Sequence, residues 1–147
     1  MNAPNTDPYQ HSRFVDAQED CYATALEEIR AGAKQSHWMW FIFPQVAGLG
    51  FSSMAQRYAI GSRNEAEAYL AHPILGPRLT ACAVALLGVH DRSAEQIMGF
   101  PDVLKLQSSM TLFSEVSSPG SVFERVLEKY YRAEKDNKTI GYLSKVA

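Results

Sequence analysis

The sequence predicts a single compact all-α domain of about seven or eight helices. Apolar residues recur with the 3.6-residue period of a helix, several segments begin with helix-capping residues, and no segment shows convincing strand alternation. A length of 147 residues fits one domain with a real hydrophobic core. We therefore expect a helical domain over residues 11–147, preceded by a flexible N-terminal tail over residues 1–10, which is polar and contains two prolines.

The helices are predicted in order from their periodicity and their ends. An apolar stripe over residues 12–31 stops at Gly32, which suits the position after a helix C-cap. Ser62, Ser93 and Ser121 are each followed three residues later by Glu or Gln, as in a capping box, and we expect Glu65 to reach back to the Ser62 N–H. The expected helices span residues 12–31, 52–60, 63–71, 77–89, 94–98, 101–116 and 122–133, with a short terminal helix from about residue 139.

The most unusual segment runs from His37 to Phe43, with the sequence His-Trp-Met-Trp-Phe-Ile-Phe, and contains both tryptophans of the chain. In a helix Trp38 and Trp40 point about 200° apart, whereas in an extended chain they share a face. No partner strand is evident, so we favour a buried irregular or short helical segment. We expect Trp38, Phe41 and Phe43 to pack in the core against the apolar face of residues 101–116.

Composition excludes several classes of function. The net charge is −2 and the pI is near 6.1, so nothing indicates nucleic acid or an anionic membrane as a partner. Cys21 and Cys82 are far apart and the four histidines lack ligand spacing, so we expect no metal and no cofactor. Without a signal sequence or a spanning apolar run, we expect a cytoplasmic protein; the sequence carries no indication of its oligomeric state.

Three segments resemble a family of small, mainly helical bacterial proteins, the domain-of-unknown-function family 1810. They are Arg13-Phe14-Val15-x-Ala17-Gln18, Ser36 to Gln45, and Lys105-Leu106-x-Ser108-Ser109-Met110-Thr111-Leu112-Phe113. The resemblance covers nearly the whole chain after the first ten residues. It implies an all-helical fold but no established activity, and therefore no catalytic residues.

Members of this family are often automatically labelled calpastatin. A calpastatin-type inhibitor is polar, repetitive and disordered until it binds its protease. The present chain is non-repetitive and 11% aromatic, with several capped helices, so we expect it to fold alone.

The first candidate site surrounds the aromatic segment. Lys34, Ser36, His37 and Gln45 flank Trp38 and Trp40, and polar groups beside stacking surfaces are typical of a small-molecule site for a ring. The alternative is that both tryptophans fill the core while His37 donates to a backbone carbonyl.

A second candidate lies on the helix predicted over residues 101–116. Asp102, Lys105 and Ser109 fall within about 60° of one another at the border of its apolar stripe, with Ser108 and Thr111 nearby. The alternative is an ordinary surface pair between Asp102 and Lys105. A third candidate, residues 136–139, is either a polar loop with a helix N-cap or a segment that brings Asp136 to a cleft.

These residues favour binding, with or without turnover, of a small anionic ligand that contains a ring, such as a nucleotide derivative. In this hypothesis Lys105 contacts the anion, Trp38 or Trp40 stacks on the ring, and Gln45, Ser108 and Ser109 add hydrogen bonds. His37 or Asp102 is the candidate catalytic acid or base. The alternative is a protein–protein interaction module without catalysis. A cavity lined by both His37 and Lys105 would favour the ligand, and a flat apolar patch would favour the partner.

Overall fold

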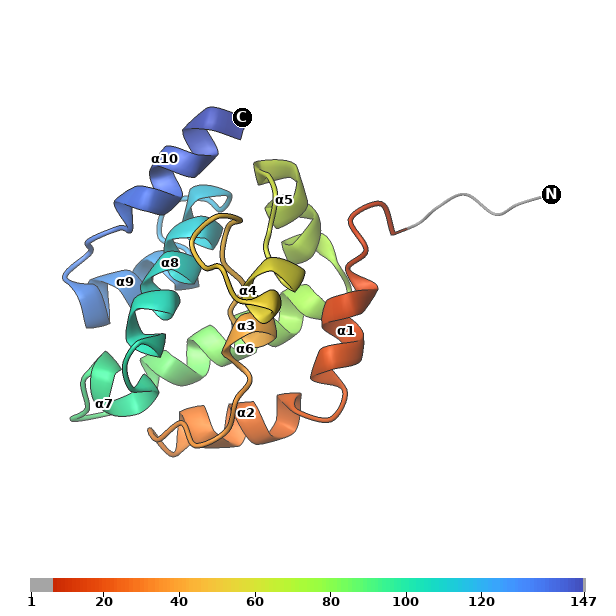
Figure 1. Ribbon diagram of the computed structural model, residues 1–147. Helices are drawn as coiled ribbons and strands as arrows, with labels where there is room; N and C mark the ends of the chain where they lie inside the picture. The colour runs from red at the N-terminus through yellow and green to blue at the C-terminus, as the bar shows by residue number, and fades with distance from the viewer. Residues whose placement is uncertain (1–6, 147) are drawn as a thin grey trace.

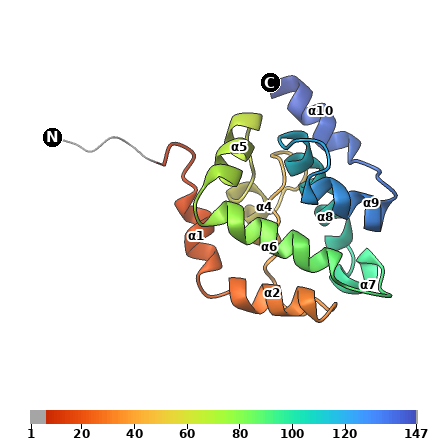
Figure 2. The same ribbon diagram turned by 180° about the vertical axis from the view of Figure 1, so that it is seen from behind.

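The computed structural model describes residues 7–146 and confirms the all-α class. Ten helices, and no strand, form within this part of the chain, where a single parallel bridge joins Val46 to Ile60. Figures 1 and 2 show the helices gathered into one compact domain. They are α1 (Ser12–Gln18), α2 (Tyr22–Arg30), α3 (Met39–Ile42), α4 (Ser53–Arg57), α5 (Arg63–Ala71), α6 (Leu75–Leu87), α7 (Ala94–Met98), α8 (Asp102–Glu115), α9 (Val122–Tyr131) and α10 (Asn137–Val146).

The prediction of one helix over residues 12–31 was wrong, because the chain turns a corner between Gln18 and Tyr22. Figure 1 shows that α1 and α2 run in different directions. The corner lets α1 pack against α3 while α2 packs against α6. The apolar period continues through the turn, so periodicity alone does not reveal it. This split, together with the short α3, accounts for two helices more than the eight segments predicted.

The aromatic segment forms α3 and the loops around it, in agreement with the short buried helix favoured by the sequence. Trp38, Phe41 and Phe43 are all buried. They belong to one hydrophobic core with Leu106 and Phe113 of α8. Burial of a large aromatic side chain is among the strongest single contributions to stability.

Helix α8 is the central element of the domain. It packs against α5, α7, α9 and α10, and every side chain from Ser108 to Ser114 is buried. Hydroxyl groups along it donate to carbonyls of the same helix, as Thr111 does to Gln107 and Ser114 to Thr111, which satisfies them inside the protein. Helix α6 lies on one side of the domain, at the front in Figure 2. Helices α3 and α4 lie on the opposite side, at the front in Figure 1.

Of the predicted flexible tail, residues 1–6 lie outside the described residues. The last four positions, 7–10, are bound to the domain. The Asp7 carboxylate accepts hydrogen bonds from the N–H groups of His11 (2.6 Å) and Ser12 (3.0 Å) at the start of α1. Tyr9 and Gln10 contribute carbonyls to the Arg13 guanidinium. The folded part of the chain therefore begins earlier than residue 11.

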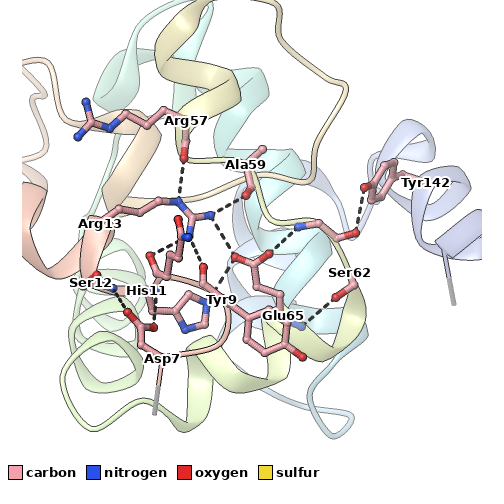
Figure 3. Close-up of polar contacts among 12 residues, drawn as sticks. Asp7, Tyr9, His11, Ser12, Arg13, Arg57, Ala59, Ser62, Glu65 and Tyr142 are labelled. Atoms are coloured by element: carbon pink, nitrogen blue, oxygen red, sulfur yellow. Dashed lines mark hydrogen bonds and ion pairs between the residues drawn. The ribbon is translucent and has the colours of Figure 1, made fainter. Parts of the chain in front are cut away.

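A buried polar cluster fastens this N-terminal segment to α5 (Figure 3). Glu65 Oε2 lies 3.1 Å from Arg13 Nη2 and 3.4 Å from His11 Nε2. Burial acts to raise the pKa of Glu65, but hydrogen bonds from His11, the Gly61 N–H and Arg13 lower it overall. All five N–H donors of Arg13 are used; the acceptors are Arg57 O, Tyr9 O, Gln10 O, Ala59 O and Glu65 Oε2.

Three helix caps predicted from serine are present, but only one is a complete capping box. Ser93 and Gln96 exchange both hydrogen bonds at the start of α7. Ser62 accepts from the Glu65 N–H as expected. The prediction that Glu65 returns to the Ser62 N–H was wrong, because its carboxylate accepts from the Gly61 N–H instead (2.9 Å) while pairing with Arg13.

Within residues 7–146 no single helix has the length and apolar character needed to cross a bilayer. Helices α5 and α6 meet that criterion only as a pair, which is bent by 87°.

Candidate functional site

A cavity of about 370 Å³ lies between the aromatic segment and the start of α8. We refer to it as the first cavity. Its volume falls within the range typical of small-molecule sites. Both His37 and Lys105 line it, so two segments that are far apart in the sequence meet there. The lining consists of residues 34–37, Met39 and Trp40 of α3, and Phe100, Pro101, Asp102 and Lys105.

The loop that forms one wall of the first cavity is held by Glu28 of α2. Glu28 Oε1 accepts hydrogen bonds from the N–H groups of Gln35 (2.8 Å) and Ser36 (3.0 Å). The same oxygen accepts from Trp38 Nε1 (3.0 Å), while Oε2 accepts from the Ser36 hydroxyl (2.6 Å). Burial acts to raise the pKa of Glu28, but these four hydrogen bonds lower it from 4.5 to about 2. A single carboxylate therefore fixes both the loop and the orientation of Trp38.

The start of this loop, just after α2, is fixed where its backbone contacts the Arg92 side chain and α7. Gly32 follows the C-cap of α2 with φ of +73°, as the sequence predicts, and a Cβ at this position would lie 2.9 Å from Arg92 Cδ. Its carbonyl accepts from Arg92 Nε (2.7 Å). The Lys34 N–H donates to Ile97 O of α7 (2.8 Å). The loop is thus bound to α2 and to α7 before it reaches the cavity.

Two lysines supply positive charge to the first cavity. Lys34 Nζ lies 2.9 Å from Asp102 Oδ2, donates to Ser36 O (2.6 Å), and is 4.9 Å from the centre of the Trp38 ring. Its side chain is only 7% exposed, so it is chiefly an internal contact between the loop and α8. Lys105 is more accessible, at 28%.

The Lys105 ammonium is well placed to meet a ligand. It lies 3.2 Å from Asp102 Oδ1 and 5.2 Å from the centre of the Trp40 ring. An ammonium group has three N–H donors, and the ion pair with Asp102 is the one polar contact that Lys105 makes within the described residues. Lys34 and Lys105 against one carboxylate leave a net charge of +1, with His37 counted as neutral.

The structure separates the roles predicted for the two tryptophans. Trp40 is half-buried and lines the first cavity. Trp38 is 1% exposed and its indole N–H is bound to Glu28, so it has no free face for a ligand. The prediction that Trp38 stacks on a ligand is therefore corrected to a role in the core. The ring that accompanies Trp40 in the cavity lining is Phe100, which is 72% exposed.

The two predicted catalytic residues, His37 and Asp102, have different surroundings. His37 is exposed and lines the first cavity, so its imidazole is accessible to a ligand there. Each oxygen of Asp102 faces a lysine ammonium. Asp102 therefore holds the two lysines in place, and its role as an acid or base stays a prediction.

A second cavity, of about 310 Å³, lies on the other side of Lys105. It shares Pro101 and Lys105 with the first cavity, so the two cavities are neighbours at the start of α8. Two predicted ligand residues, Gln45 and Ser108, line this second cavity rather than the first. Its lining is Gln45, Leu49, Pro101, Leu104, Lys105, Gln107, Ser108, Asp136 and Lys138.

Both interpretations of residues 136–139 hold in part. Asp136 caps α10, because its Oδ2 accepts from the Thr139 N–H (3.2 Å). It also lines the second cavity, where Ser108 Oγ donates to the same oxygen (3.0 Å).

Ser109 is the predicted site residue that the structure removes from the ligand site. It is fully buried, it lines neither cavity, and its hydroxyl has no hydrogen-bond partner among the described residues. From Leu106 onward α8 is covered by neighbouring helices, so a position at the border of its apolar stripe is enclosed. No group of three or more His, Cys, Asp or Glu side chains suited to a metal ion occurs within residues 7–146.

Sequence reasoning missed Glu28 and Phe100. Glu28 contacts residues 7 to 10 positions ahead of it, and its role depends on the direction of the turn at Gly32. No local pattern indicates that direction. Phe100 lies just before Pro101, and no pattern in the sequence marks it as a cavity residue.

The pKa of Glu28 leads to a pH-dependent prediction. Because the pKa is lower in the folded state than in the unfolded state, the unfolded state binds more protons as the pH falls. The stability that Glu28 contributes is therefore complete above about pH 5 and is lost as the pH falls toward about 2. We expect Glu28→Gln to lower the free energy of unfolding at pH 7 by about 1–3 kcal/mol and to flatten its decline between pH 5 and 2.

Denaturant unfolding at a series of pH values measures this effect. Glu27→Gln is the matched control, since Glu27 is exposed on the same helix and its side chain makes no hydrogen bond or ion pair with the described residues. Equal pH profiles for the two variants would contradict the assigned role of Glu28.

The fold and the cavities define a class: a single-domain, all-α protein with a cavity formed by lysine and aromatic side chains. The family described as a protein of unknown function (DUF1810) matches residues 8–143, and the chain belongs to this family. It is 49% identical to a conserved hypothetical protein from Mycobacterium tuberculosis of known crystal structure. That similarity covers 94% of this chain and 99% of the other, with a TM-score of 0.92. No curated protein matches the chain.

The first of the three segments that resemble the family, residues 13–18, contributes to the fold rather than to the lining of the two cavities. Arg13 holds the N-terminal segment, Phe14 is buried in the core, and Gln18 Nε2 donates to Phe41 O (2.7 Å). These residues build the fold at a distance from the two cavities. By contrast, the second and third motifs include Ser36, His37, Trp40 and Lys105, which line the first cavity.

Proposed function

We propose that this protein binds a small anionic ligand that contains a ring, such as a nucleotide derivative, in the first cavity. The observation that carries the proposal is that Lys105 and Trp40 lie together, with the ammonium 5.2 Å from the ring centre, at the edge of a cavity of about 370 Å³. A ring can stack on an aromatic side chain while an attached anion meets a lysine.

Charge and accessibility both support this proposal. Among the side chains that line the cavity, two lysines outnumber one carboxylate, and the Glu28 carboxylate behind the wall is already bound by four hydrogen bonds, so an anion is favoured over a cation. Phe100 adds a second aromatic side chain to the lining, which supports a ligand that contains a ring. We assign proton transfer to His37 if the bound ligand is turned over, since it is the exposed imidazole in the cavity lining.

The alternative is a protein-interaction module, and it is favoured by the exposure of Phe100 (72%) and Leu104 (52%) near the start of α8. Neighbouring apolar side chains at a surface are typical of docking sites. A small anionic ring compound distinguishes the two functions, because a ligand-binding protein binds it and an interaction module does not.

Calorimetric titration with adenosine monophosphate tests the proposal. Adenosine supplies the ring without the anion, and ribose 5-phosphate supplies the anion without the ring. We expect both fragments to bind more weakly than the nucleotide. We expect Lys105→Met to lower the affinity for the nucleotide by about tenfold or more, equivalent to about 1.4 kcal/mol, because the phosphate loses its ammonium partner.

Lys135→Met is the matched control. Lys135 pairs with Glu115 at the surface and lines neither cavity, so its loss should leave nucleotide affinity unchanged. Both variants should retain wild-type stability within about 1 kcal/mol, since exposed ion pairs contribute little. An affinity that is the same in Lys105→Met and wild type, or the absence of nucleotide binding, would overturn the proposal and favour the interaction module.

A further inference from the structure

The second cavity differs in chemistry from the first. Both cavities are lined by two lysines and one carboxylate, but the first adds aromatic rings, whereas the second adds the amide groups of Gln45 and Gln107, the Ser108 hydroxyl and apolar side chains. Amides, which donate and accept hydrogen bonds, and carboxylates, which accept them, are suited to a moiety rich in hydroxyl groups.

Asp136 is held in a fixed position with one oxygen available. Its Oδ2 accepts hydrogen bonds from Ser108 Oγ, Thr139 Oγ1 and the Thr139 N–H, and its own N–H donates to Thr111 Oγ1 (2.9 Å). Its Oδ1 accepts no hydrogen bond from any residue between 7 and 146. The carboxylate is thus oriented by the protein on one side and can accept ligand hydroxyl groups on the other.

Lys105 lies at the junction, because it lines both cavities. Lys138 lines the second cavity as well. A ligand that extends from Trp40 past Lys105 toward Asp136 would therefore carry its ring in the first cavity, its negative charge at the junction, and its hydroxyl groups in the second cavity.

We infer that the ligand is a nucleoside diphosphate sugar, whose sugar occupies the second cavity and hydrogen-bonds to Asp136. This inference rests on the proposed function, since it assumes that the base and phosphate bind in the first cavity. Asp136 is a binding residue in this scheme, and Gln45 is a second polar contact to the sugar.

Comparison of ADP-glucose with ADP tests the inference on the full chain. We expect wild-type protein to bind ADP-glucose about tenfold more tightly than ADP, which corresponds to about 1.4 kcal/mol. Asp136→Asn should reduce this advantage to about threefold or less while leaving the affinity for ADP unchanged. Asparagine is nearly as good an N-cap as aspartate, so α10 should remain intact.

Gln45→Ala provides a second variant that does not alter a helix cap. Its side chain makes no hydrogen bond within the described residues, so we expect little change in stability and a smaller loss of the ADP-glucose advantage. If ADP binds and glucose adds no affinity, or if Asp136→Asn weakens both ligands equally, the inference is overturned and the proposed function stands. If neither ADP nor ADP-glucose binds, the proposed function fails and the inference fails with it.

Discussion

Trp38→Ala is expected to lower the free energy of unfolding by about 3–5 kcal/mol, the usual cost of removing a buried aromatic side chain. Trp38 is 1% exposed, its ring lies 6.2 Å from that of Phe43, and its indole N–H is bound to Glu28. The substitution leaves a cavity in the core and removes one of the donors that satisfy the Glu28 carboxylate. Denaturant unfolding followed by circular dichroism measures the loss.

Trp40→Ala is the natural comparison for this variant, because Trp40 is only half-buried at the edge of the first cavity. We expect it to lose less than half as much stability as Trp38→Ala. Similar losses for both variants, or a minor loss for Trp38→Ala, would contradict the division of the two tryptophans into a core residue and a cavity residue.

Gly76→Ala is expected to destabilise the protein by about 3 kcal/mol or more, at or above the upper end of the range for overpacking. A Cβ at Gly76 would lie 2.1 Å from Leu70 O, near the end of α5. Because the obstructing atom belongs to the backbone, it cannot rotate away. The close approach arises where α5 and α6 meet at 87°.

Gly141→Ala is the matched control, since it makes the same change inside a helix with no atom within 4 Å of the added Cβ. An alanine normally stabilises a helix relative to glycine, by about 0.5–1 kcal/mol. We therefore expect the two variants to change the melting temperature in opposite directions. If the Gly76→Ala protein is as stable as wild type, Gly76 does not approach the backbone of α5 so closely.

Local patterns in the sequence predict most of the helices. The serine caps at the starts of α5, α7 and α9, and the glycine after α2, depend on hydrogen bonds between residues a few positions apart. The corner between α1 and α2 is different. Its apolar stripe continues without interruption, and the turn is determined by contacts with α3 and α6, which are remote in the sequence.

The candidate site could be predicted only in part. Aromatic composition predicts that most of the segment from His37 to Phe43 is buried, but it does not tell which tryptophan faces a cavity. Trp38 and Trp40 are two residues apart, so their relative orientation depends on the backbone conformation, which their spacing leaves open. Glu28 could not be predicted because its partners lie beyond a turn.

The helical wheel of α8 predicts that Lys105 and Ser109 share one border of the helix, but the two residues have different surroundings in the domain. Lys105 lines the cavity as predicted, because the first turns of α8 are covered on one side only. Ser109 lies one turn further along, where its side chain is fully buried inside the domain. A helical wheel gives the direction of a side chain but not the depth of the helix in the domain.

The proposed binding of an anionic ring compound beside Trp40 is tested most directly by NMR of the two tryptophan indole N–H groups during titration with adenosine monophosphate. The chain contains only two tryptophans, and they report on different places. We predict a saturable shift of the Trp40 signal, little change in the Trp38 signal, which is bound to Glu28, and loss of the Trp40 shift in Lys105→Met. An unchanged Trp40 signal, or a shift that persists in Lys105→Met, would contradict the proposed site.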